Sequence, residues 1–93
     1  MYNKELAERQ NKYLVELGQR LRDIRTKNSI TRREIAETIM VSLATIQKVE
    51  QGKQNNIFII HKIAYYLRLF TGVHITEIFN DLDIIHSNEI NWG

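Results

Sequence analysis

Few residues in this 93-residue chain have the types and spacing that enzyme or metal chemistry needs. There are no cysteines, and the three histidines, His61, His74 and His86, stand too far apart for a local metal-binding motif. The sequence contains no nucleophile elbow, no phosphate-binding glycine loop and no carboxylate pair placed beside a histidine on one rigid element. We therefore expect a protein that is not an enzyme and that uses no metal and no cofactor.

The remaining candidates are basic side chains, and they are concentrated in the middle of the chain. The formal net charge is +2, yet residues 20–62 alone carry +5, residues 1–19 are neutral and residues 63–93 carry −3. A basic middle segment indicates either a surface that faces a polyanion or an ordinary mixed-charge surface. No apolar run is long enough for a membrane span, and the lack of cysteine favours a reducing compartment, so we expect a cytoplasmic protein.

The elements that position these residues are predicted to be helices, because proline is absent and the apolar residues repeat at helical spacing. Thr31, Ser42 and Asn56 are suitable N-caps, and Gly52 and Gly72 are suitable terminators. The chain is short enough for a single all-α domain. We predict helices over about 14–28, 31–39, 42–51, 56–70 and 75–82. Residues 14–82 then form the domain, residues 1–13 an N-terminal arm or an extension of the first helix, and residues 83–93 a C-terminal tail.

The second and third predicted helices are short, lie close together and have a small residue, Ala36, where they would cross. This arrangement is typical of a helix-turn-helix, although a plain helical bundle also contains such pairs. Helical periodicity places Ile46, Val49 and Glu50 on the inward side of the third helix. It places the following residues on the outward side: Leu43, Ala44, Gln47, Lys48 and Gln51.

Three stretches, Ile30–Ala36, Val41–Ser42 and Val49–Lys53, resemble the phage-repressor-like Cro/cI, or XRE, family of helix-turn-helix regulators. The resemblance covers about residues 14–82. It implies a five-helix, lambda-repressor-like domain that binds a palindromic operator in double-stranded DNA as a homodimer and regulates transcription, and we expect a repressor. The rival interpretation is a protein-interaction module, such as an antitoxin or an anti-regulator, built on the same scaffold.

The resemblance also implies a role for individual residues. Its base-reading positions correspond to Leu43, Ala44 and Lys48, with Gln47 beside them. Leu43 and Ala44 can contact only thymine methyl groups, so hydrogen-bonded reading would depend on Gln47 and Lys48; alternatively, Leu43 packs on a neighbouring element. Arg25 and Glu50 correspond to an ion pair between the first and third helices. The phosphate-binding candidates are Arg32, Ser42, Arg33, Thr45, Lys53 and Asn55, of which Arg33 and Lys53 could equally be solvated charges.

Two features depart from the family pattern. Met40 stands where the family usually has glycine, which implies either a strained left-handed backbone or a reshaped turn. Of the two we predict the left-handed conformation, which methionine adopts only under strain. Phe58 and Ile59 stand where the family is usually polar, and the tail contains the apolar residues Ile84, Ile85, Ile90 and Trp92. These apolar residues are expected either to form a homodimer surface or to pack against the N-terminal arm.

Overall fold

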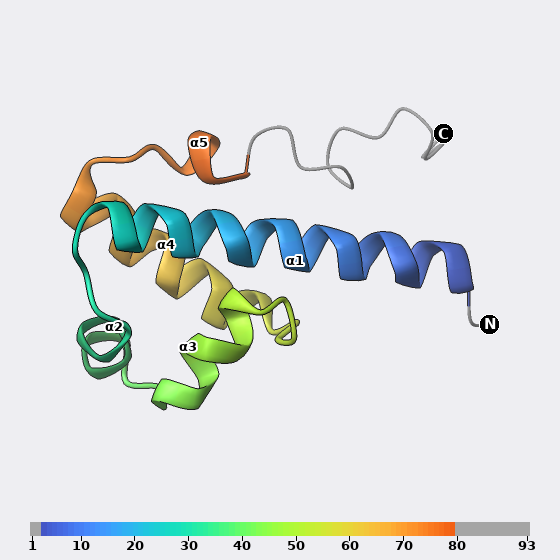
Figure 1. The fold of residues 1–93 in the computed structure, drawn as a ribbon, viewed down its shortest axis with the longest axis horizontal. Helices are drawn as coiled ribbons and strands as arrows, with labels where there is room; N and C mark the ends of the chain where they lie inside the picture. Colours follow the sequence, from blue (N-terminus) through green and yellow to red (C-terminus); the bar gives the residue numbers. More distant parts are fainter. Residues whose placement is uncertain (1–2, 80–93) are drawn as a thin grey trace.

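The computed structural model describes residues 3–79, and within this range the chain consists of helices, turns and loops without a strand. The helices are α1 (Lys4–Lys27), α2 (Arg32–Ile39), α3 (Leu43–Glu50), α4 (Ile57–Thr71) and α5 (Ile75–Phe79). The all-α, five-helix architecture predicted from the sequence is confirmed (Figure 1). The predicted end of the last helix at residue 82 and the predicted tail, 83–93, lie outside the described residues.

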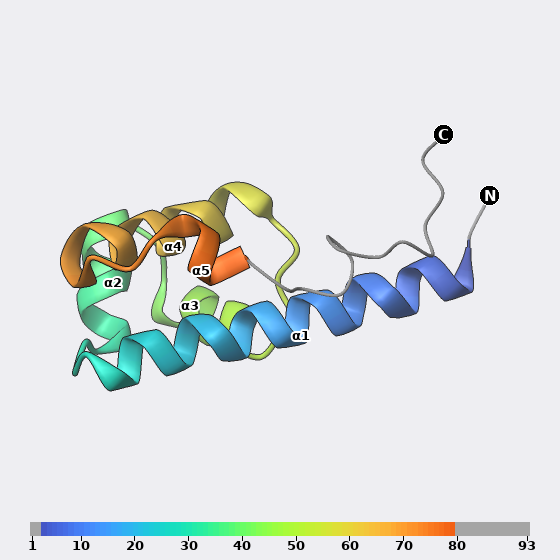
Figure 2. The same ribbon diagram turned by 90° about the horizontal axis from the view of Figure 1, so that it is seen from above.

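α1 is one continuous helix of 24 residues, so residues 4–13 extend the first helix instead of forming a separate arm. The side chain of Asn3 caps it by accepting a hydrogen bond from the Leu6 amide at 3.0 Å. The buried residues of α1 all lie in its C-terminal half, from Leu17 to Arg25. Its N-terminal part projects beyond the other four helices in both views (Figures 1 and 2).

The core is formed where α1, α2, α3, α4 and α5 each bury an apolar stripe, as helical periodicity requires. Its fully buried large side chains are Leu17, Leu21, Ile35, Ile46, Ile60, Leu67 and Ile78. Gly18 allows α1 to approach the end of α3, because a Cβ atom there would lie 2.2 Å from the Val49 carbonyl oxygen. The backbones of the first and third helices are therefore in direct contact.

The turn between α2 and α3 is compact because α2 ends in a left-handed residue. Met40 has φ 61° and ψ 48°, which confirms the conformation predicted from its place in the sequence. The amides of Met40 and Val41 both donate to the Ala36 carbonyl, which closes the end of α2. The Met40 side chain is 89% exposed, so it gains no burial in return for the strained backbone.

Candidate nucleic-acid interface

The outward side of α3 carries the four predicted base-reading residues, and all four are exposed. Leu43 and Ala44 lie in the first turn of the helix, and Gln47 and Lys48 lie one turn later. Leu43 keeps 40% of its surface exposed and also lines a hollow beside α2, so it both packs and faces solvent. The structure therefore presents two apolar and two polar side chains along one accessible helix face.

The inward side of α3 is held by a buried network of charges. Glu50 accepts hydrogen bonds from Arg25, through Nε at 2.6 Å and Nη2 at 3.2 Å. It also accepts one from Arg32 Nε at 2.8 Å. Arg25 Nη1 in turn donates to the Ile30 carbonyl at 3.0 Å. One carboxylate thus connects the end of α1, the start of α2 and the end of α3, and it satisfies charges that would be costly to bury alone.

Arg32 makes a contact with Glu50 that the sequence did not predict. The sequence assigned it only to a DNA phosphate, whereas the structure anchors its Nε on Glu50 while its side chain stays 36% exposed. Within the described residues, its two terminal nitrogens have no hydrogen-bond partner. The guanidinium is therefore held in place at the surface, and the N–H donors of its two terminal nitrogens are available to a ligand.

The N-termini of α2 and α3 are both capped by hydroxyl side chains. Thr31 accepts a hydrogen bond from the Glu34 amide at 3.0 Å, and Ser42 accepts one from the Thr45 amide at 3.1 Å. The Ser42 and Thr45 hydroxyls also lie 2.8 Å apart. These two phosphate candidates form one hydroxyl pair at the positive end of α3, where free backbone amides and the helix dipole favour an anion.

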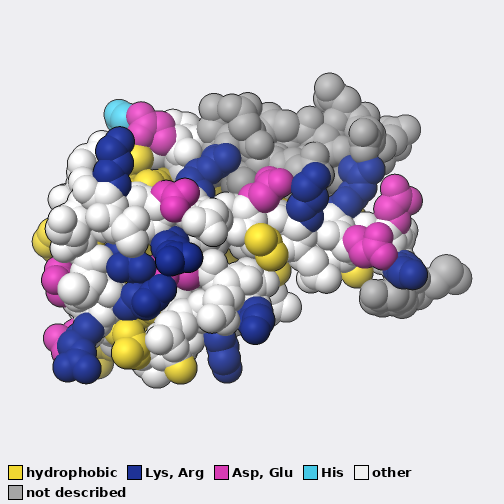
Figure 3. Space-filling view, in the orientation of Figure 1, with side chains coloured by type: hydrophobic (Ala, Val, Ile, Leu, Met, Phe, Trp, Pro, Cys, Tyr) yellow, Lys and Arg dark blue, Asp and Glu magenta, His cyan; other side chains and the backbone are white. Residues whose placement is uncertain are grey.

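Basic side chains gather on the same face of the molecule. Figure 3 shows Lys and Arg side chains over α2, α3 and the adjacent end of α1, with a few acidic side chains among them. The candidates Arg33, Lys48, Lys53 and Asn55 are all exposed. Lys53 and Asn55 follow the C-terminal end of α3, Arg32 bonds to Glu50 at that same end, and Ser42 caps the N-terminal end.

A hollow of about 500 Å³ lies between the start of α2 and the outward side of α3. Thr26 and Ser29 line it together with Arg33 and Gln47. Neither Thr26 nor Ser29 was among the predicted contact residues, and their position at the end of the first predicted helix is the only signal for them in the sequence. Their hydroxyl groups extend the polar surface from α3 toward α1.

Comparison with known protein families matches residues 21–64 to the family described as helix-turn-helix. The matched range begins within α1, spans α2 and α3 and ends within α4. Comparisons with curated proteins and with solved structures find no match. Among the described residues, no helix is long and apolar enough to cross a membrane, and no group of three His, Asp or Glu side chains could hold a metal ion.

Proposed function

We propose that the chain is a DNA-binding regulator that recognises a specific operator sequence, a proposal supported by the match of residues 21–64 to the helix-turn-helix family. In this proposal the protein acts in the cytoplasm as a homodimeric repressor that covers promoter DNA. The observation that carries it is the outward side of α3, an accessible face on a helix whose inward side is fixed by buried contacts.

α3 enters the major groove in this proposal, as the second helix of such a pair does. Gln47 and Lys48 supply the polar contacts to base edges, and Leu43 and Ala44 pack against thymine methyl groups. A protein with this face should prefer sites in which thymines stand beside adenine, which Gln47 can bind, or guanine, which Lys48 can bind. The rigid inward network supports this reading because it fixes the direction in which α3 presents these side chains.

Phosphates on either side of the groove are bound by the residues around the two helix N-termini. Arg32 contributes its two terminal nitrogens, and the Ser42–Thr45 hydroxyl pair and the first amides of α3 bind a second phosphate. Arg33, Lys53 and Asn55 extend this contact along the backbone. The anchoring of Arg32 on Glu50 supports its role, since a side chain held in place loses less conformational entropy on binding.

The regulator acts as a homodimer because a single eight-residue recognition helix covers only one half-site. Two copies related by a two-fold axis place their α3 helices in successive major grooves, about 34–36 Å apart, and so require a palindromic operator. Dimerisation also explains how a small domain obtains enough contacts for specific binding.

Enrichment of bound fragments from random duplex DNA, followed by sequencing, tests the proposal. We expect a palindromic consensus, and affinity for it that falls steeply as salt rises, because bound cations release counterions from the phosphates. A pool that shows no enriched sequence after several rounds would contradict sequence-specific binding.

A second candidate function, binding to a protein such as a toxin or another regulator, is favoured by one specific observation. Two of the four predicted base-reading residues on the outward side of α3, Leu43 and Ala44, are apolar and exposed. An apolar protein interface changes little with salt, in contrast to a phosphate-anchored complex. Salt dependence of the complex therefore separates the two functions.

A further inference from the structure

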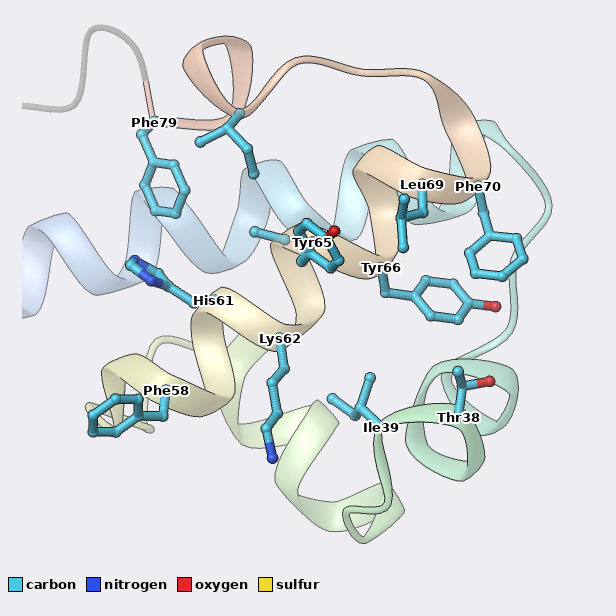
Figure 4. A pocket seen from close by; sticks show the side chains of 12 residues that line it. Thr38, Ile39, Phe58, His61, Lys62, Tyr65, Tyr66, Leu69, Phe70 and Phe79 are labelled. Atoms are coloured by element: carbon cyan, nitrogen blue, oxygen red, sulfur yellow. The ribbon is translucent and has the colours of Figure 1, made fainter.

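One side of α4 carries large apolar side chains that no other described element covers. Phe58, Tyr65, Leu69 and Phe70 are 76%, 53%, 61% and 65% exposed. With Thr38 and Ile39 of α2 and Phe79 of α5, they line a groove of about 760 Å³, here called the α4 groove (Figure 4). Ile59, by contrast, packs partly against the core, so of the two apolar residues expected at the surface of α4 only Phe58 is fully presented.

The amount of apolar surface indicates that something covers it. Aromatic side chains bury roughly 150–250 Å² each when they are enclosed, so three half-exposed rings and a leucine leave several hundred Å² uncovered. A contiguous exposed patch of this size on a small domain usually marks a contact surface. The groove lies on elements that are not part of the outward side of α3, so DNA binding does not account for it.

The charge of the α4 groove restricts what can occupy it. α4 carries Lys62 and Arg68 and no acidic residue, and no Asp or Glu is among the residues that line the groove. Lys62 itself lines the groove, and the Arg68 guanidinium lies 6.0 Å from the centre of the Tyr65 ring. Two α4 helices facing each other would place like charges together. The groove therefore favours an occupant that is both apolar and acidic.

The chain itself contains such a segment. Residues 80–93, which lie outside the described part, follow directly after Phe79, whose ring stands at one edge of the groove and contacts His61 at 5.6 Å between ring centres. They include three acidic residues, no Lys or Arg, and the apolar residues Leu82, Ile84, Ile85, Ile90 and Trp92.

The length of this segment matches the groove. Fourteen residues span about 21 Å as a helix and up to about 46 Å when extended, whereas the 15-residue α4 is about 22 Å long. The segment is therefore about as long as α4 when it is helical and about twice as long when it is extended. A tethered segment also has an effective local concentration in the millimolar range, so weak contacts suffice.

We propose that residues 80–93 pack into the α4 groove of their own molecule, with apolar side chains against Phe58, Tyr65 and Leu69 and acidic side chains beside Lys62. The contact joins α4 to α2 through Thr38 and Ile39, and so adds support to the first helix of the helix-turn-helix. The proposal does not depend on the proposed operator binding, because none of the residues that line the α4 groove is among those assigned to DNA contact.

Trp92 is the only tryptophan in the chain, and it reports directly on this contact. In the full-length protein we expect its fluorescence emission to lie at shorter wavelength than in a synthetic peptide of residues 80–93, and acrylamide to quench it several-fold less. Phe58→Ala and Tyr65→Ala should shift both properties toward those of the peptide. Val15→Ala, a change at a half-exposed residue of α1 outside the groove, is the matched control and should leave them unchanged.

The charge contribution is tested separately. Lys62→Glu should weaken the contact and shift the emission to longer wavelength, Lys53→Glu in the loop before α4 should not, and Lys62→Glu combined with Asp83→Lys should restore the original emission. Circular dichroism of each variant establishes that the helices remain folded. Emission identical to that of the peptide, or a shift insensitive to all groove substitutions, would overturn the proposal. So would a shift that appears only as protein concentration rises, since the occupant would then belong to a second copy.

Discussion

The two sides of α3, a helix of only eight residues, have different roles. The inward side places Ile46, Val49 and Glu50 in the core, where they are at most 9% exposed. The outward side leaves Leu43, Ala44, Gln47 and Lys48 at the surface, where within the described residues none makes a side-chain hydrogen bond or an ion pair. The buried side chains of the helix are on one side, and the side chains available to a partner are on the other.

This division teaches that the position of the recognition surface and its specificity are set by separate residues. The Glu50 network fixes where α3 lies relative to α1 and α2. The outward side chains can then change without disturbing that position. Substitutions on the two sides should therefore affect different measured quantities, stability on one side and DNA binding on the other.

The largest effect is expected for Glu50→Ala on the inward side. The substitution leaves the buried Arg25 guanidinium without its carboxylate, which should lower the free energy of unfolding by about 3–5 kcal/mol. Thermal and urea denaturation measure this loss. Gln47→Ala, on the same helix, is the control and should melt close to the wild type; equal melting temperatures for the two variants would remove the distinction between the sides.

Gln47→Ala should instead change what the protein binds. If Gln47 reads a base edge, its removal costs about 1–3 kcal/mol of discrimination at one position in each half-site. Repeating the duplex enrichment with the variant tests this expectation, and Gln19→Ala on the exposed side of α1 is a matched control. An unchanged consensus would show that Gln47 takes no part in reading.

Arg32 belongs to both sides, because it bonds to Glu50 and also reaches the surface. The effect of Arg32→Ala on DNA binding is therefore the next to be tested. We expect affinity to fall alike for all duplexes and the slope of log affinity against log salt to flatten by about one, since phosphate contacts carry no direct sequence information. Binding titrations over a salt series measure both quantities. A changed sequence preference at an unchanged slope would refute the phosphate role.

The smallest effect is expected in the turn that joins α2 to α3. Met40→Gly relieves left-handed strain of roughly 1–2 kcal/mol and loses almost no packing, because the side chain is exposed. Greater freedom of the unfolded chain offsets about 0.4–1 kcal/mol of that gain. We therefore expect an unchanged or slightly raised denaturation midpoint.

Gly72→Ala at the end of α4 tests the opposite change, because it introduces a side chain at a left-handed residue instead of removing one. Gly72 has φ 78°, and nothing lies within 4 Å of a Cβ atom there, so the substitution isolates the backbone effect. It should lower the midpoint. A clear loss of stability in Met40→Gly at an unchanged denaturant slope would show that Met40 contributes something beyond its backbone conformation.

The sequence by itself determined the features that depend on near neighbours in the chain. Helices begin after the caps at Thr31, Ser42 and Asn56. At each cap, a side-chain oxygen accepts a hydrogen bond from the backbone amide two or three residues further along the chain. Met40 ends α2 in a left-handed conformation, and the inward and outward sides of α3 follow from 3.6-residue periodicity. Such interactions are short in sequence and can be read directly from it.

Only the tertiary structure decided which distant residues meet. Arg32 and Glu50 are 18 positions apart, and nothing in the local pattern showed that they share a hydrogen bond; Thr26 and Ser29 likewise enter the interface only because α1 ends beside α3. The uncovered α4 groove also depends on how the helices pack. Periodicity fixes which face of a helix is apolar, but the relative placement of helices determines which neighbour that face meets.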